Sequence, residues 1–167
     1  MGVMESDVLV VGGGLAGTWA ALRARELADN VVLVEKAKVA RSGASTSASG
    51  VMLCPTEGDD LAAWRREIVE HGEYMNDQEW VDVLLRDQVE RIKEMDSWGM
   101  AFERDETGQI KRMVGRGHKS SRILTFEGKK LMEKMRDKAL ERGVKLVERV
   151  MVTDLVTSDG NHPTHGS

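Results

Sequence analysis

The stretch DVLVVGGGLAG, residues 7–17, decides the fold of this 167-residue chain. Its first five residues form a β-branched apolar run, which is typical of a strand buried on both faces of a parallel sheet. Four of the next six residues are glycine. Glycine in such a cluster indicates backbone in special conformations or backbone that lies close to a ligand. The stretch therefore predicts a buried strand followed at once by a tight glycine turn.

The residues that follow complete a strand–helix–strand unit. Leu15 to about Ala28 is rich in Ala, Leu and Arg, which favour a helix. Asp29 and Asn30 end this helix, and the apolar run Val31 to Val34 predicts a second buried strand that ends in Glu35. A strand, a glycine turn, a helix and a strand within about 30 residues make a βαβ unit, so we expect a Rossmann-like α/β fold with a parallel sheet core.

The rest of the chain predicts inserted helices and a hairpin. Helices are expected after a cap at Asp59 or Asp60 and after a cap at Asp77, because aspartate accepts hydrogen bonds from the free N–H groups of a helix start. Residues 102–114 predict a hairpin turned at residues 105–108. The final elements are a helix over residues 128–142 and a strand over residues 144–157, followed by a turn at residues 158–160. We find no linker long enough to mark a domain boundary and expect one domain over residues 1–167.

Residues 12–17, GGGLAG, satisfy the pattern G-x-G-x-x-G. Gly12 permits the tight turn off the strand, Gly14 lets a pyrophosphate approach the backbone, and Gly17 lets the helix pack closely on the strand. The pyrophosphate then meets the N–H groups and the positive dipole end of the helix. Glu35 at the end of the next strand would accept hydrogen bonds from ribose hydroxyls. The glycine pattern in this context predicts a dinucleotide site, but it does not separate NAD from FAD. The alternative is that the glycines serve only the tight packing of the helix on the strand.

Residues 41–50, RSGASTSASG, are small and hydroxylated throughout. Such a segment supplies hydroxyls and backbone amides without bulk, which suits a second pass along an extended cofactor toward its pyrophosphate and flavin. The same composition is also typical of a flexible Ser-rich surface loop. Both interpretations stay open at this point.

Composition excludes several functional classes. With 41% apolar and 31% charged residues the chain forms a core and a polar surface, unlike a disordered chain. The net charge of −4 argues against a nucleic-acid partner. The single Cys54 excludes an internal disulfide and a cysteine-ligated zinc or iron–sulfur site within this chain. The chain has neither an apolar run long enough for a membrane span nor a signal peptide, so we expect a cytoplasmic protein.

Several residues have the chemistry of metal, substrate or redox sites, but a structural or surface role explains most of them. His162 and His165 have the spacing of metal ligands but no nearby carboxylate partner, so we predict no metal site. Residues 111–122 carry five cations, which would steer an anionic substrate or simply form a solvated basic loop. We interpret His118 within that run as a surface histidine and Cys54 as a packing residue.

Three motifs in order, DVLVVGGGLAG, VVLVEKA (residues 31–37) and RSGASTSASG, resemble the N-terminal part of the FAD-dependent fumarate reductase/succinate dehydrogenase flavoprotein family. Aspartate oxidases and the flavoprotein subunit of adenylylsulfate reductase belong to the same family. The resemblance implies a Rossmann-like FAD-binding domain in an oxidoreductase that transfers a hydride to or from a small carboxylate or oxyanion substrate. It also implies an electron-transfer (iron–sulfur) subunit as partner. The alternatives are an NAD-dependent dehydrogenase and a catalytically inactive nucleotide-binding remnant.

The resemblance also assigns cofactor contacts, position by position. The glycine turn would hold the pyrophosphate. Glu35 and Lys36, at the end of the second strand, would lie at the adenosine ribose. The small polar segment would line the pyrophosphate and flavin. VERVMVTDLVTSDG (residues 147–160) resembles the strand that passes the adenine end of FAD through its backbone. The set expected at FAD is Gly12, Gly13, Gly14, Leu15, Ala16, Gly17, Glu35, Lys36, Ser42, Gly43, Ala44, Ser45, Thr46, Ser49, Gly50, Val150 and Met151.

Two departures from the family pattern matter. Members with covalent flavin read R-S-H-T after the second strand, whereas residues 41–44 read R-S-G-A, so Gly43 replaces the linking histidine and implies non-covalent FAD. The family's substrate-binding His and Arg residues lie in a capping domain and a C-terminal segment, which residues 1–167 do not reach. We therefore expect the N-terminal portion of a longer flavoenzyme, truncated at the C-terminus, and identify no catalytic side chain.

Overall fold

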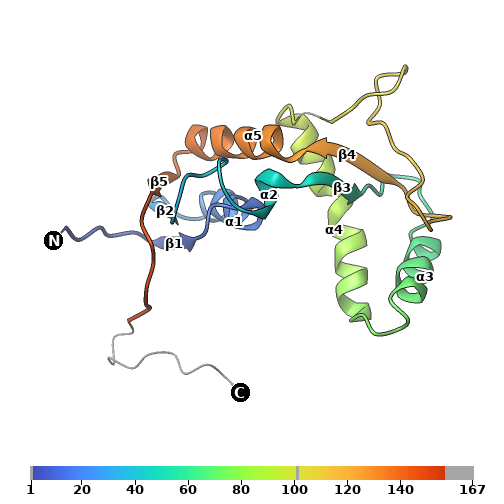
Figure 1. The fold of residues 1–167 in the computed structure, drawn as a ribbon, viewed down its shortest axis with the longest axis horizontal. Helices are drawn as coiled ribbons and strands as arrows, with labels where there is room; N and C mark the ends of the chain where they lie inside the picture. Colours follow the sequence, from blue (N-terminus) through green and yellow to red (C-terminus); the bar gives the residue numbers. More distant parts are fainter. Residues whose placement is uncertain (1, 101, 157–167) are drawn as a thin grey trace. The chain divides into compact units, whose positions relative to one another are not determined.

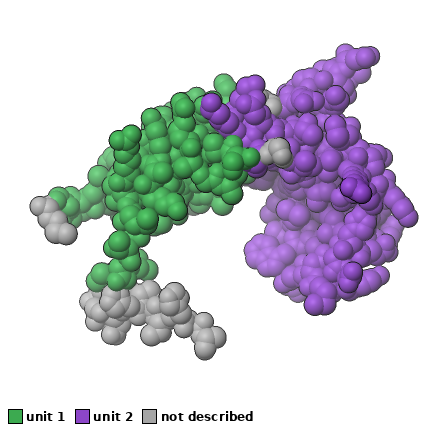
Figure 2. All heavy atoms as spheres, viewed as in Figure 1, with its two compact units in different colours: residues 1–47, 132–167 green, residues 48–131 purple. Residues whose placement is uncertain are grey.

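The computed structural model describes residues 2–100 and 102–156, which contain five strands and five helices (Figure 1). In chain order they are β1 (Val8–Val11), α1 (Leu15–Ala24), β2 (Val31–Glu35), α2 (Ala44–Ser47), β3 (Ser49–Leu53), α3 (Leu61–His71), α4 (Gln78–Ser97), β4 (Ile123–Glu127), α5 (Gly128–Glu141) and β5 (Lys145–Glu148). None of these described helices combines the length and apolar character needed to cross a lipid bilayer. The chain forms two compact units, residues 1–47 with 132–167, and residues 48–131 (Figure 2).

A three-stranded parallel sheet in the order β1-β2-β5 is the centre of the first unit. All five residues of β2 are buried, which explains its unbroken apolar sequence. Leu33 pairs with Val10 on one side and with Leu146 on the other. Helix α1 contacts β1 and β2 and buries Ala21 and Leu22. The predicted βαβ unit and its parallel sheet are confirmed.

Two elements of this unit are shorter than the sequence predicts. Helix α1 ends at Ala24 instead of Ala28, and Leu27 beyond it is 93% exposed, so no apolar contact draws a further turn onto the sheet. Strand β5 ends at Glu148 instead of continuing over residues 144–157. Glu148 pairs with Glu35, the last residue of β2, so β2 offers no further strand residues for pairing beyond this point. The turn predicted at residues 158–160 lies outside the described residues.

The second unit contains an antiparallel pair of strands, β3 and β4, that the sequence analysis missed. Residues 41–50 read as one small polar segment, but α2 occupies its centre and β3 begins at Ser49. Gly50 and Phe126 face each other across the pair. A Cβ on Gly50 would lie 2.1 Å from the ring atom Cζ of Phe126, so the aromatic ring covers the backbone where only glycine leaves room.

Helices α3 and α4 of the second unit begin at aspartate caps, as predicted. The carboxylate of Asp60 accepts a hydrogen bond from the Ala63 N–H at 3.0 Å, and that of Asp77 accepts one from the Trp80 N–H at 3.2 Å. The apolar core of this unit contains Trp64, Val81 and Leu85, with Leu53 and Ile68 packed against it.

The predicted hairpin over residues 102–114 consists of isolated pairings in the part of the chain that the structure describes. Arg104 pairs with Ile110 in antiparallel fashion. Between them the turn lies where predicted, with the Gly108 N–H donating to the Asp105 carbonyl at 3.0 Å. The segment therefore contains the predicted hydrogen-bonded turn, but the residues on either side of it do not form regular strands.

Candidate functional site

The turn between β1 and α1 requires glycine at two positions. Gly12 has a φ of +103°, which side chains disfavour, and its N–H donates to the Val34 carbonyl at 2.8 Å. A Cβ on Gly17 would lie 1.8 Å from the carbonyl oxygen of Gly12, so α1 approaches the turn too closely for any side chain. The tight turn and the close helix packing expected of the glycine pattern are both present.

The start of α1 presents backbone N–H groups beside open space. Gly14 is the N-cap residue and has no side chain of its own to cap the helix, while the Ser45 hydroxyl accepts the N–H of Leu15. Among the described residues, the N–H groups of Gly14 and Ala16 have no hydrogen-bond acceptor. A Cβ on Gly14 would meet only the hydroxyl of Ser45, at 3.6 Å. This arrangement suits phosphate oxygens, because free N–H groups and the helix dipole both favour an anion.

The carboxylate of Glu35 holds the glycine turn in place. Oε2 accepts a hydrogen bond from the Gly13 N–H at 2.6 Å, and Oε1 accepts one from the Ala37 N–H at 3.0 Å. The Gly13 hydrogen bond, helped by Ala37 and Lys36, outweighs burial and holds the pKa of the carboxyl below its ordinary value. An ionised carboxylate has about four lone-pair sites, so the backbone N–H groups of Gly13, Ala37 and Lys36 leave room for a ribose hydroxyl.

The hydroxyl-rich segment after β2 forms mostly local hydrogen bonds. The Ser42 hydroxyl donates to the Lys38 carbonyl at 3.2 Å, and the Thr46 hydroxyl donates to the Ser42 carbonyl at 3.1 Å. Ser45 is different, because its Oγ accepts a hydrogen bond from the Leu15 N–H at 3.3 Å. The segment therefore returns to the helix start through Ser45, 30 residues later in the chain.

The other residues predicted to contact FAD do not gather at the start of α1. Val150 follows β5, and its N–H donates to the Glu35 carbonyl at 3.1 Å, so that N–H already has a partner. Met151 is 63% exposed. Lys36, Gly43 and Ala44 are exposed as well, whereas Ser49 and Gly50 lie in β3 of the second unit.

Three of these segments stand at one edge of the sheet. The glycine turn follows β1, Glu35 ends β2, and Val150 follows β5, so all lie at the carboxyl ends of adjacent parallel strands. Nucleotides bind at this edge in open α/β sheets. The space over Gly14, the N–H groups of α1 and the spare lone pair of Glu35 fit a pyrophosphate followed by a ribose, which NAD and FAD share.

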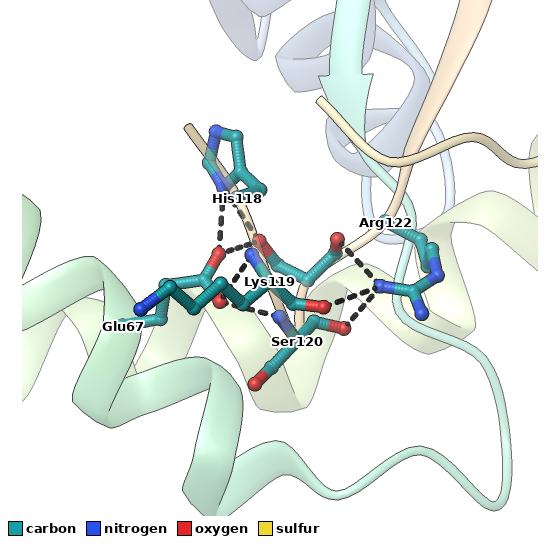
Figure 3. Close-up of polar contacts among 6 residues, drawn as sticks. Glu67, His118, Lys119, Ser120 and Arg122 are labelled. Carbon is teal, nitrogen blue, oxygen red and sulfur yellow. Dashed lines mark hydrogen bonds and ion pairs between the residues drawn. The ribbon is translucent and has the colours of Figure 1, made fainter. Parts of the chain in front are cut away.

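A second cluster surrounds the buried carboxylate of Glu67 (Figure 3). Oε2 accepts hydrogen bonds from the N–H groups of Lys119 and Ser120, and Oε1 lies 2.6 Å from Ser121 Oγ and 2.8 Å from His118 Nδ1. Burial raises the pKa of this carboxyl, but the hydrogen bonds outweigh burial and bring the pKa to about 2. His118, expected at the surface, is instead half-buried and bonded. Sequence patterns missed this pair because 51 residues separate Glu67 from His118.

The basic run over residues 111–122 is only in part a solvated loop. Arg112 donates to the carboxylate of Asp59 at 2.6 Å and to the carbonyl of Cys54 at 3.1 Å. Arg122 donates to three successive carbonyls of its own loop. Both arginines line a cavity of about 640 Å³ in the second unit. Cys54 is fully buried, and burial raises the pKa of its thiol to about 11, in keeping with packing rather than redox chemistry.

Sequence comparisons identify the fold's family. Residues 7–166 match the family model described as FAD binding domain. The flavoprotein subunit of 8-methylmenaquinol:fumarate reductase from Wolinella succinogenes is 30% identical over 95% of this chain and 27% of its own length. L-aspartate oxidase from Clostridium perfringens is 27% identical over 90% of this chain and 34% of its own length. The chain thus spans about a third or less of the length of these relatives.

Solved structures show the same fold. Quinol fumarate reductase from E. coli superposes with a TM-score of 0.83 at 22% identity, covering 97% of this chain and 29% of that one. The Sdh1 complex from Mycobacterium smegmatis gives a TM-score of 0.81 at 20% identity, covering 94% and 30%. The glycine turn, the acid at the end of β2 and the match over residues 7–166 agree, so this chain belongs to the FAD binding domain family, whose cofactor is FAD, together with fumarate reductase flavoproteins and L-aspartate oxidases.

Proposed function

We propose that this chain is the FAD-binding part of a flavin-dependent oxidoreductase that transfers a hydride to or from a small carboxylate or oxyanion. FAD supplies the redox chemistry when bound, while the protein supplies position and electrostatics. The names of the relatives support the substrate class, because fumarate and L-aspartate are both four-carbon dicarboxylates. A catalytically inactive nucleotide-binding module is the competing proposal.

Most of the assigned cofactor contacts belong to the first unit. Gly12 to Ala16 would hold the pyrophosphate, and Glu35 with Lys36 would bind the adenosine ribose. Residues 42–50 would line the pyrophosphate and flavin, and the backbone of residues 150–151 would contact adenine. The observation that carries these assignments is the open space over Gly14 beside the N–H groups of α1.

Further proposals concern the flavin link and the protein's surroundings. FAD would be bound non-covalently, because Gly43 has no side chain where the resemblance places the linking histidine.

An electron-transfer, iron–sulfur subunit is the proposed partner, since the Wolinella relative is itself named a flavoprotein subunit. We assign residues 1–167 to the FAD-binding domain, and propose a cytoplasmic location because a single cysteine suits a reducing compartment.

Fluorescence titration with FAD tests the site. Gly14→Val should weaken FAD binding at least about 100-fold, equivalent to ~2.7 kcal/mol, because the new side chain fills the space of the pyrophosphate. The variant should keep its stability, since the extended backbone of Gly14 (φ −77°, ψ −175°) accepts valine and only Ser45 lies nearby. Gly2→Val is the matched control, because Gly2 is exposed with nothing close to it. Equal FAD affinity in wild type and Gly14→Val would overturn the site.

Two further measurements separate the alternatives. A parallel titration with NAD should show much weaker binding than FAD, and the reverse order would favour an NAD-dependent enzyme. Because residues 1–167 span about a third or less of the relatives' length, we expect this chain alone to bind FAD weakly and to reduce no fumarate with a reduced dye as electron donor. Stoichiometric FAD with measurable fumarate reduction would exclude the inactive module and would show that residues 1–167 are active by themselves.

A further inference from the structure

Two histidines and one glutamate converge in the second unit. Glu67 and His71 are four residues apart on α3, which places them on the same face of the helix. His118 comes from the loop before β4, and its ring lies edge-on to that of His71 with centroids 5.2 Å apart. One ligand atom from each of the three residues lies within 4.8 Å of the others. Folding thus assembles a cluster that no short sequence motif contains.

Hydrogen bonds from the loop before β4 fix the orientation of the Glu67 carboxylate (Figure 3). The N–H groups of Lys119 and Ser120 hold Oε2 at 2.9 and 2.5 Å. Oε1 therefore faces His118 Nδ1, at 2.8 Å, with the Ser121 hydroxyl beside both atoms. Metal-binding carboxylates are commonly fixed in this way by hydrogen bonds to the oxygen or lone pair that does not bind the metal.

Space and charge at the cluster permit a cation. Glu67 and His71 line a cavity of about 160 Å³, so the cluster is reached from outside. The other charged groups on that cavity are Arg66, Glu70 and Lys119. With Glu67 ionised, the two acids balance the two bases around the cavity, which leaves the imidazole nitrogens and the carboxylate as ligands without a net repelling charge.

We propose that Glu67, His71 and His118 form a binding site for a divalent transition metal of the zinc class. Two imidazoles and one carboxylate, with a fourth position for water, are a recurrent zinc ligand set. Zinc–ligand bonds of about 2.0–2.1 Å place tetrahedral ligands about 3.3 Å apart. Glu67 Oε1 and His118 Nδ1 already approach that spacing, and the exposed His71 needs only a side-chain rotation to complete it.

Metal binding would change the cluster in a defined way. His118 would bind the cation through Nδ1 as the tautomer that carries its proton on Nε2, so two bonds to the metal would replace the hydrogen bond between Nδ1 and Glu67 Oε1. The Ser121 hydroxyl and the two loop N–H groups keep their hydrogen bonds to Glu67. The metal would therefore tie the loop over residues 118–121 to α3 and raise the stability of the second unit.

The experiment uses the full chain with His162→Ala and His165→Ala, so that the H-x-x-H pair outside the described residues cannot contribute to the measured metal binding. Calorimetry with Zn²⁺ should give one site per chain, and Co²⁺ should give the visible absorption of a tetrahedral complex. His71→Ala should weaken Zn²⁺ binding at least about 100-fold, and Ser121→Ala about 10-fold. Mg²⁺ should not compete, because it prefers oxygen ligands.

The exposed position of His71 keeps this test clear of folding effects. His71→Ala should leave the metal-free melting temperature and the FAD affinity unchanged, while the increase in melting temperature on adding Zn²⁺ should disappear. Glu67→Gln provides a second variant that should also lose the metal. Absence of stoichiometric Zn²⁺ binding, or unchanged binding in His71→Ala, would overturn the proposal without touching the FAD site.

Discussion

The carboxylate of Glu35 accepts a hydrogen bond from the backbone N–H of Gly13 at 2.6 Å, joining residues 22 positions apart. A Cβ on Gly13 would lie 3.2 Å from the same carboxylate oxygen and 2.7 Å from Val39, so the acid packs directly on the turn. Glu35 therefore has a structural role before any ribose is bound. It positions the turn that faces the phosphate groups, and it does so in its ionised form.

Glu35→Gln should destabilise the first unit. The amide keeps one oxygen acceptor, so either the Gly13 or the Ala37 N–H loses its partner, at a cost of about 1–3 kcal/mol. The folded-state pKa of Glu35 lies below its unfolded value of about 4.3. Its contribution is therefore complete above pH 4.3 and is lost as the pH falls through the folded-state pKa. Urea unfolding at pH 7 and pH 3 should show the variant's deficit shrinking at low pH.

Glu26→Gln is the matched control for this pH series. Glu26 pairs with Arg23 on the surface of the same unit, and such exposed pairs contribute little to stability. A deficit of Glu35→Gln that is equal at both pH values would show that the charge of Glu35 does not matter.

Gly17→Ala should damage the fold itself, unlike a substitution at Gly14. The added Cβ would lie 1.8 Å from a backbone carbonyl that cannot move without opening the turn. We expect a loss of about 3 kcal/mol or more in the free energy of unfolding, at the upper end of overpacking effects. Gly14→Ala should stay within about 1 kcal/mol of wild type. Chemical denaturation of both variants checks this contrast, and similar stabilities would contradict it.

Local patterns predicted most of the first unit and the starts of helices α3 and α4 in the second unit. The apolar runs of buried strands and the helix caps at Asp60 and Asp77 depend on contacts within a few residues, so they can be recognised in the sequence. Gly143 takes the positive φ expected after a helix, at +79°. The end of β5 was mispredicted because it depends on where β2 ends, which is information from another strand.

Features made by contacts between distant segments could not be read from the sequence. Strand β3 was hidden because Ser49 and Gly50 continue a run of small residues, and only pairing with β4 reveals its extended form. The Glu67 cluster was missed for the same reason, since its loop partners lie more than 50 residues away. At the candidate cofactor site, the spacing of Gly12, Gly17 and Glu35 was visible, but the hydrogen bond from Gly13 to Glu35 was not.

Gly50→Ala should destabilise the second unit through a single ring. The added Cβ would lie 2.1–2.3 Å from three ring atoms of Phe126, its partner across the strands. We expect a loss of about 1–3 kcal/mol. Phe126→Leu should recover part of that loss in the double variant, because the smaller side chain leaves the backbone of residue 50 uncovered. Additive losses in this double-mutant cycle would show that the ring is not the cause.

The flavin link can be tested at Gly43. Acid precipitation of the FAD-loaded chain should release all flavin into the supernatant, because Gly43 has no side chain to form a bond. Gly43→His should behave in the same way. Residue 43 has a φ of +90°, a left-handed conformation that costs a side-chain-bearing residue about 1–2 kcal/mol, so the new imidazole would be strained. No other described atom lies within 4 Å of the added Cβ to hold it in place. Yellow colour retained in the wild-type pellet would disprove non-covalent binding, and retention only in Gly43→His would show that this backbone accepts the linking residue.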